Sequence, residues 1–270
     1  MPWSSDHMKW LTNIKSYKTA NNNDIVLLEF NYDETDTVAM SLWAKHFRNH
    51  YCLDDEIDKI KPAHMSRSEY LISYKFPGGN APGPSIQSGD FSEILVSDYL
   101  AFTLNYWVPR TRYGSKTIKN ESTKGSDVMG FKIVSPGTVS PSDSMIIVES
   151  KAQFSGQKPL PRLQVAIDDS IKDSTRIGES LNAIKQRLFD KNLLADANNI
   201  SRFQDPVGSP YKEEYGAAAL FLSSVYDEDE VKKTDSSKHP KAGNLALIVI
   251  HGNDMMNLVK RLYKLASDEA

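Results

Sequence analysis

The segment SMIIVESKAQ, residues 144–153, decides the fold of this sequence. Its first half is an apolar run from Met145 to Val148 between turn residues, which predicts a buried strand. Glu149 and Lys151 follow at once. Charges at the end of a core strand are costly unless they are paired or bound to a metal. Their position therefore calls for a chemical explanation.

A second carboxylate is expected beside the first. Alternate side chains of a strand share a face, so Glu149, Lys151 and Gln153 project together. Asp127 stands at the head of the preceding predicted strand, SDVMGFKIV (126–134), and the intervening segment suits a loop between neighbouring strands. Two carboxylates and a lysine should therefore meet at one edge of a sheet.

Apolar periodicity predicts further elements on both sides of this edge. We expect helices over 35–51, 90–104, 162–192 with a break near Gly178, and 255–266. The predicted strands cover 24–32, 69–76, 105–113, 217–225 and 244–250, and the charged run 226–241 is predicted to be a solvated loop. Glycines and prolines within 77–89 predict a flexible boundary.

The pattern suits phosphodiester hydrolysis. That reaction needs hard cations, which neutralise developing charge and activate a water, and carboxylates are the ligands that Mg²⁺ prefers. Asp127 and Glu149 supply them, with Mn²⁺ as an alternative ion. Lys151 is placed to hold the attacking water. On the preceding helix, Glu93 adds a further carboxylate, with Asp98 as a weaker substitute.

Three stretches carry a resemblance to a known superfamily. SGDFSEIL (88–95), GSDVMGF (125–131) and IIVESKAQ (146–153), in this order, resemble the motifs of the PD-(D/E)xK nucleases. The resemblance implies that Glu93, Asp127 and Glu149 are metal ligands and that Lys151 activates water. Gln153 and Gln164 match looser accessory polar positions. Ser126 stands where the name-giving proline would be, a position that varies in the superfamily.

Most of residues 89–270 is also similar to the HamA family, the nuclease subunits of the Hachiman anti-phage system. The stretches that carry this similarity are GSDVMGFKI, VESKAQ, VAIDDSIKD, AALFLSS and ALIVIHGNDMMNLVKRLYKL. It implies a helicase partner, phage or plasmid DNA as target, and a nuclease held in check until the partner responds.

The two resemblances imply an α/β fold with a restriction-endonuclease-like mixed central sheet flanked by helices. On this interpretation residues 90–270 form the nuclease-like domain. Residues 81–89 form a linker, and residues 1–80 form an N-terminal α/β attachment of unknown role.

A basic segment precedes the proposed site. It could follow a phosphate backbone, although a basic surface loop without function is equally common. The candidate DNA contacts are Arg110, Arg112, Lys116, Lys119 and Lys124.

Composition excludes several classes of protein. Hydrophobic residues make up 40% and charged residues 25%, as in ordinary globular proteins. No apolar run approaches the roughly 20 residues that span a bilayer, and no secretory signal is visible, so we expect a cytoplasmic protein that does not engage membranes. Cys52 is the single cysteine, which excludes an internal disulfide and cysteine-rich zinc sites. The net charge of −3 means that affinity for DNA is local or supplied by a partner.

Other interpretations remain open. Glu230 and Lys232 repeat the Glu-x-Lys spacing without an apolar strand before them, so the spacing alone is weak. His46 and His50, four residues apart, could face one metal but lack an adjoining glutamate, which favours packed or solvent-facing histidines. The chain could also be a catalytically silent adaptor or DNA-recognition subunit with a nuclease fold. A purely structural protein would place Asp127 and Glu149 apart, as surface ion pairs.

Overall fold

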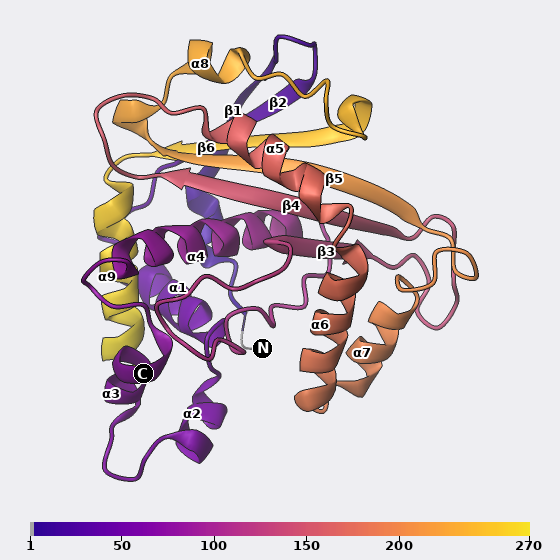
Figure 1. The fold of residues 1–270 in the computed structure, drawn as a ribbon. Helices are drawn as coiled ribbons and strands as arrows, with labels where there is room; N and C mark the ends of the chain where they lie inside the picture. The colour runs from indigo at the N-terminus through magenta and orange to yellow at the C-terminus, as the bar shows by residue number, and fades with distance from the viewer. Residues whose placement is uncertain (1–2) are drawn as a thin grey trace.

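One mixed sheet organises the protein. The computed structural model describes residues 3–270. The sheet has six strands in the order β1-β2-β6-β5-β4-β3, with helices on both faces (Figure 1). The strands are β1 (Leu11–Lys18), β2 (Asp24–Phe30), β3 (Val128–Lys132), β4 (Ser144–Gln153), β5 (Lys212–Leu222) and β6 (Leu245–Gly252). The predicted α/β class, with a mixed sheet flanked by helices, is confirmed.

The four central strands, β2, β6, β5 and β4, run parallel, and an antiparallel strand closes each edge. Parallel strands are buried on both faces and read as continuous apolar runs, which is why β4, β5 and β6 were predictable. The polar edge strand β1 was not predicted, because most of its side chains are exposed. Residues 1–80 contribute β1 and β2 to the same sheet as the rest of the chain.

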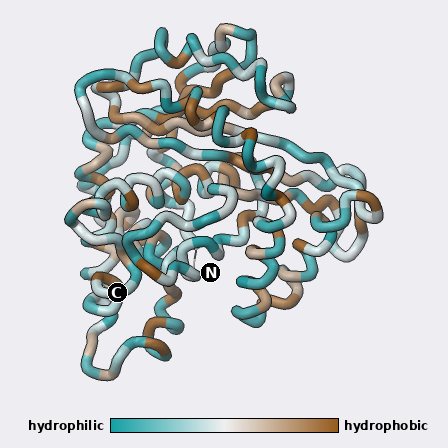
Figure 2. The backbone as a smooth tube through the Cα atoms, in the orientation of Figure 1, coloured by the Kyte–Doolittle hydropathy of each residue, from teal (hydrophilic) through white to brown (hydrophobic). Residues whose placement is uncertain are grey.

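Two helical layers cover the sheet. One face packs against α1 (Thr37–Asn49), α4 (Gly83–Asp98) and α9 (Met255–Asp268), and the other against α5 (Arg162–Asp173), α6 (Ile177–Asp190) and α7 (Leu194–Ser201). Along β4, Ile146 and Val148 face the first layer while Met145 and Ile147 face the second. The strands of the sheet are accordingly the most apolar part of the backbone trace (Figure 2).

The prediction of a strand over 69–76 is wrong. These residues form α3 (Arg67–Tyr70) and the π-helical turn η2 (Leu71–Lys75). The reason is local: Ser66 accepts a hydrogen bond from the Glu69 amide and Glu69 accepts one from the Ser66 amide. This capping box starts a helix, and the Ser-x-x-Glu spacing was readable in the sequence.

Two other boundaries differ from the prediction. Helix α4 begins at Gly83, so residues 83–89 of the predicted linker are helical, and it continues into the π-helical turn η3 (Tyr99–Thr103). Residues 105–113 are not a strand, because Pro109 interrupts them and only Trp107 pairs with Phe131. They begin a long irregular segment that reaches β3.

The remaining helices are short. Within the charged run 226–241, Asp227 caps α8 (Glu228–Lys232), so that run is not entirely a loop. The other short helical turns are η1 (Asp6–Trp10), α2 (Asp54–Ile60), η4 (Ser223–Val225) and η5 (Ala242–Asn244). Within residues 3–270, no helix combines the length and apolar character needed to cross a membrane.

Two glycines predict opposite responses to one substitution. A Cβ on Gly216 of β5 would lie 3.0 Å from Val148 Cγ2 and 3.1 Å from the Ala246 carbonyl oxygen, whereas a Cβ on Gly178 of α6 meets nothing within 4 Å. Gly216→Ala should lower the free energy of unfolding by about 1–3 kcal/mol. Gly178→Ala should leave it unchanged or raise it by up to about 1 kcal/mol. Urea denaturation checks both, and equal effects would contradict the packing of β5.

Candidate active site

The strand register brings the two predicted metal ligands together. Val128 of β3 pairs with Val148 of β4, so Asp127 and Glu149 occupy the next opposed positions at one end of the two strands. Asp127 precedes the first residue of β3, and its Oδ2 accepts a hydrogen bond from the Ser150 amide at 3.1 Å. The backbone of β4 therefore fixes the orientation of this carboxylate.

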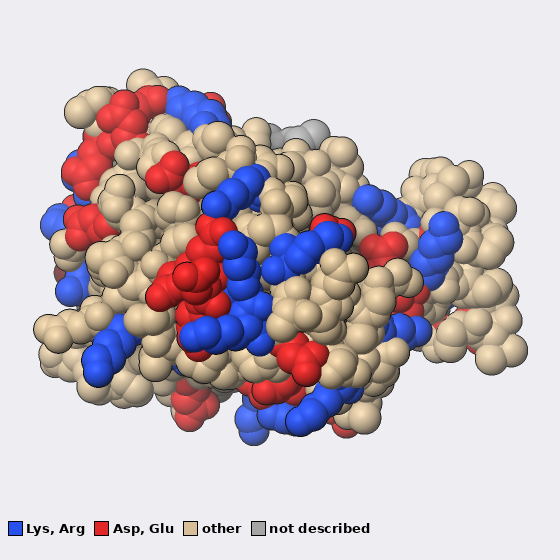
Figure 3. All heavy atoms as spheres, turned by 90° about the horizontal axis from the view of Figure 1, so that it is seen from above, with Lys and Arg blue, Asp and Glu red and all other residues tan. Residues whose placement is uncertain are grey.

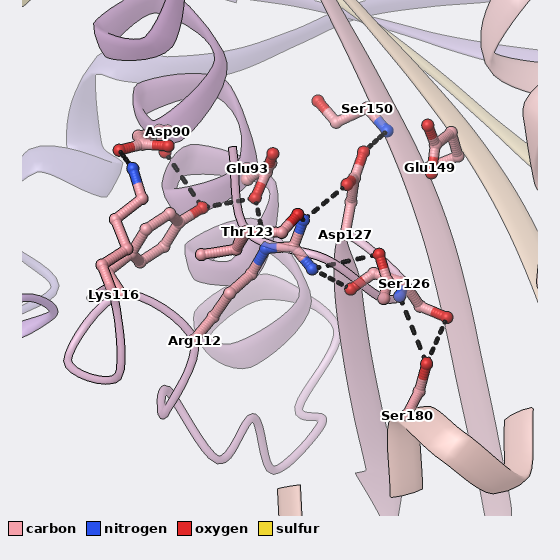
Figure 4. A network of polar contacts seen from close by, with 12 residues as sticks. Asp90, Glu93, Arg112, Lys116, Thr123, Ser126, Asp127, Glu149, Ser150 and Ser180 are labelled. Atoms are coloured by element: carbon pink, nitrogen blue, oxygen red, sulfur yellow. Dashed lines mark hydrogen bonds and ion pairs between the residues drawn. The ribbon is translucent and has the colours of Figure 1, made fainter. Parts of the chain in front are cut away.

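Arg112 joins the third carboxylate to this pair (Figure 4). Its Nε lies 2.8 Å from Glu93 Oε2 on α4, and its Nη2 lies 2.9 Å from Asp127 Oδ1. The guanidinium also donates to the carbonyls of Thr123, Gly125 and Ser126. One side chain thus connects α4, the irregular segment before β3 and the start of β3.

Glu93 has a second donor. Tyr113 donates a hydrogen bond from its hydroxyl to Glu93 Oε2 at 2.6 Å. One helical turn earlier, Asp90 accepts from Tyr51 at 2.7 Å and forms an ion pair with the buried Lys116. The acidic face of α4 is therefore built into a network of phenols and cations, as Figure 4 shows.

Lys151 lies between two carboxylates. Its Nζ is 2.5 Å from Glu149 Oε1 and 3.0 Å from Asp169 Oδ2 on α5. The Lys151 side chain keeps 25% of its surface exposed, whereas Glu149 keeps 12%. The amine is thus held beside the acids and still reaches solvent.

These groups surround a cleft of about 750 Å³. Glu93, Asp127 and Lys151 line it together with Arg112. The first residues of three helices, α4, α5 and α9, also contribute to the wall. Arg162 and Lys260 on two of these helices add basic side chains, so the lining of the cleft combines acids and cations.

Burial and mutual repulsion shift the acids toward their neutral forms. Burial, reinforced by the charge of Asp127, raises the pKa of Glu149 to about 8. Burial also raises the pKa of Glu93 to about 8, although Arg112 opposes the shift. The pKa of Asp173 rises to about 6 for the same reason, with Asp127 adding to it. Burial and neighbouring carboxylates therefore both favour the protonated forms of these acids.

Sequence reasoning missed two acids of this group, Asp169 and Asp173 on α5. Asp169 contacts Lys151, and Asp173 accepts a hydrogen bond from Ser126 at 3.0 Å. The two residues stand four positions apart and so share one helix face. That spacing was the available signal, but it does not say which strand the face meets.

The accessory residues take other positions. The Gln153 side chain bonds to the backbone of Lys158 and Leu160 and closes the loop after β4. Gln164 bonds to Asp168 and to the backbone of Asp235. In this structure both amides support loops, and neither is paired with Asp127 or Glu149.

Several residues of the basic segment are already neutralised. Arg110 pairs with Asp98, Arg112 pairs with Glu93 and Asp127, and Lys116 pairs with Asp90. The Arg110 and Lys116 side chains are only 4% and 3% exposed. Two cations remain near the surface: Lys119 donates to a backbone carbonyl, and Lys124 borders a second cavity.

A separate buried group contains His7, His46 and Asp98. Their ligand atoms lie within 4.8 Å of one another, so this group could hold a metal ion. In the structure, these three side chains are joined by hydrogen bonds. His46 Nδ1 accepts from the Ser4 amide at 3.1 Å, which leaves the proton on Nε2, and Nε2 contacts Asp98 at 3.0 Å. His46 and Arg110 hold the pKa of Asp98 well below its usual range, although burial opposes them.

A family model named HamA matches residues 5–266. The chain belongs to the HamA family, the family of the Hachiman defence subunit. The similarity to the HamA family, expected for most of residues 89–270, is thereby confirmed, and the match begins as early as residue 5. No curated protein and no solved structure matches the chain.

Asp127, Glu149 and Glu93 offer oxygen donors only, the kind of ligand that Mg²⁺ and Mn²⁺ prefer. Within residues 3–270, however, the group whose ligand atoms all lie within 4.8 Å of one another is His7, His46 and Asp98. The raised pKa values of Glu93 and Glu149 arise mainly from burial, with Asp127 adding to them. A cation beside Asp127 would take over the charge compensation that Arg112 now provides.

The raised pKa of Glu149 predicts a pH-dependent stability. Its ordinary pKa is 4.5 and its pKa in the fold is about 8, so folding favours the protonated form. The contribution is complete below about pH 4.5 and is lost as pH rises through about 8. In EDTA, the free energy of unfolding should therefore fall between pH 5 and 9, and Glu149→Gln should reduce that slope. Glu121→Gln, an exposed control, should keep the wild-type slope; equal slopes in both variants would refute the shift.

Proposed function

We propose that this chain is a metal-dependent nuclease that hydrolyses phosphodiester bonds in DNA. We further propose that it acts as the effector of an anti-phage defence complex with a helicase partner. The observation that carries the proposal is that Glu93, Asp127 and Lys151 line one cleft, while Glu149 lies opposite Asp127 in the strand register and contacts Lys151. Membership of the HamA family supports the defence role.

Each side chain has a role in this mechanism. Asp127 and Glu149 would hold Mg²⁺ or Mn²⁺, with Glu93 completing the carboxylate set. The bound cation supplies charge neutralisation at the phosphate and lowers the pKa of a water. Lys151 is positioned by Glu149 and Asp169 to donate to that water or to the developing charge. Ser150 keeps Asp127 oriented through its amide.

Basic residues in and near the cleft supply the DNA contacts in this proposal. Arg162 and Lys260 line the cleft itself. Lys119 and Lys124 are the cations of the basic segment closest to the surface, whereas Arg110, Arg112 and Lys116 would have to leave their acids to contact phosphate. On the face seen in Figure 3, acidic and basic side chains lie next to one another rather than in a broad basic surface. A helicase partner that grips DNA would supply the missing affinity.

One observation favours the alternative of a catalytically silent adaptor. Arg112 is paired with two of the proposed metal ligands, at 2.8 and 2.9 Å. If that pairing is permanent, the acids never assemble around a metal. Metal-dependent cleavage and Mn²⁺ affinity distinguish the nuclease from the adaptor.

The cleavage experiment compares the two Glu-x-Lys pairs, Glu149–Lys151 and Glu230–Lys232. Lys151→Ala should reduce metal-dependent cleavage of supercoiled DNA by about 100-fold or more, since a donor to the transition state is lost. Lys232→Ala, in the exposed Glu230–Lys232 copy on α8, is the matched control and should cleave like the wild type. Both are assayed with Mg²⁺ and Mn²⁺, alone and with any helicase encoded beside this chain. Equal activity of the two variants would exclude the proposed role of Lys151.

The affinity experiment measures how Arg112 affects the binding of Mn²⁺. Arg112→Gln removes the cation that competes for Glu93 and Asp127, so calorimetric titration should show Mn²⁺ binding about tenfold tighter than in the wild type. Arg202→Gln, which removes an arginine that follows α7 and pairs with Asp143 before β4, should not change the affinity.

Arg112 also holds loop carbonyls, so thermal unfolding is recorded for each variant. Arg112→Lys, which keeps the charge without the double contact, should give an intermediate affinity. Absence of Mn²⁺ binding in the wild type and all three variants would favour the adaptor.

A further inference from the structure

A second cavity lies beside the catalytic cleft. It has a volume of about 260 Å³ and is enclosed by α6, by the segment 108–113 and by residues 124–129. Arg112 and Asp127 line both the cavity and the cleft. The cavity therefore adjoins the proposed metal site directly, because Asp127 borders both.

Part of the cavity lining, here called the apolar wall, consists of apolar side chains from three segments. Tyr113 and His50 also line the cavity. The volume lies just below the range of about 300–1,000 Å³ that is usual for small-molecule pockets, which suits one flat ring system and not two. The apolar lining consists of Val108, Pro109, Val128, Met129, Ala183 and Ile184.

The rest of the lining carries uncompensated positive charge. Arg110 and Arg112 have acidic partners, but the side chains of Arg187, which follows Ala183 and Ile184 by one turn of α6, and of Lys124 make no hydrogen bond or ion pair to residues 3–270. Burial and the nearby charge of Arg112 lower the pKa of Arg187. Glu179, an exposed acid on the lining, makes no ion pair with either cation among residues 3–270.

A half-buried guanidinium beside a second guanidinium is unfavourable unless an anion accompanies it. Arginine binds phosphate oxygens in a bidentate manner, and lysine adds a point charge. A ligand with one anionic end and one flat, weakly polar end matches this lining, because it offers an anion to the unpaired cations and an apolar surface to the apolar wall.

We propose that this cavity binds a single nucleotide, with its phosphate against Arg187 and Lys124 and its base against the apolar wall. This proposal stands independently of whether the neighbouring cleft cleaves DNA. The shared chemistry has two sources, a free nucleoside monophosphate or one nucleotide of a strand that enters from the cleft.

Calorimetric titration of the full chain tests the proposal. The Lys151→Ala variant in EDTA is used throughout, so that no cleavage interferes. The probes are dAMP, deoxyadenosine, inorganic phosphate and a 5′-phosphorylated single-stranded oligonucleotide. Because the site reads both ends of the ligand, dAMP or the oligonucleotide should bind about tenfold or more tightly than deoxyadenosine and phosphate.

Two substitutions locate the binding. Arg187→Ala should weaken it about tenfold or more by removing the phosphate contact, and Ala183→Phe should weaken it by filling the apolar wall. Arg67→Ala, which removes an arginine of α3 from an exposed ion pair with Asp58 of α2, should have no effect. Each variant is first shown to unfold at the wild-type temperature.

The two sources give different patterns. Binding of dAMP that depends on Arg187 and Ala183 assigns the cavity to a free nucleotide. Binding of the oligonucleotide alone, with the same dependence, assigns it to a strand. Absence of binding by both probes, or binding that neither substitution weakens, would overturn the proposal.

Discussion

The ion pairs of Arg112 with Glu93 and Asp127 are the interaction on which the site depends. Without a cation between them, two carboxylates from α4 and β3 would repel each other in a partly buried place. The same guanidinium binds three carbonyls of the segment before β3. That segment has little regular structure to fix it, so Arg112 determines both the charge balance of the site and the path of the chain around it.

The sequence predicts the local part of this arrangement well. The apolar run before Glu149 and Lys151 is a property of neighbouring residues, and strand alternation fixes their common face. Asp127 is found because an antiparallel register extends one position beyond Val128 and Val148. The partners of Arg112 are not predictable in this way. From the sequence alone, the basic residues suggest a surface that contacts DNA. The fold shows instead that each acid of α4 pairs with one of these basic residues.

The same limit explains the fold-level errors. Alternating apolar residues in 69–76 suit a strand, yet the Ser66–Glu69 capping box commits the chain locally to a helix. The edge strand β1 is polar, because an edge position buries little of it, so its pairing with β2 gives no apolar signal. An apolar pattern indicates that a strand is buried, but it does not indicate which strand pairs with it. The parallel pairing of β2 with β6 therefore emerges only from the structure.

Charge balance also distinguishes the two acidic groups of the molecule. Asp98 is fully buried, and its oxygens accept from His7, His46 and the cation Arg110, so its charge is compensated within the fold. At the cleft, Glu93 and Asp127 share Arg112, Glu149 contacts Lys151, and Glu93 and Glu149 have raised pKa values. A fully compensated carboxylate stabilises the fold and has little reason to recruit an ion. Acids that share one cation gain from binding another, and the proposal of a metal site at the cleft rests on this difference.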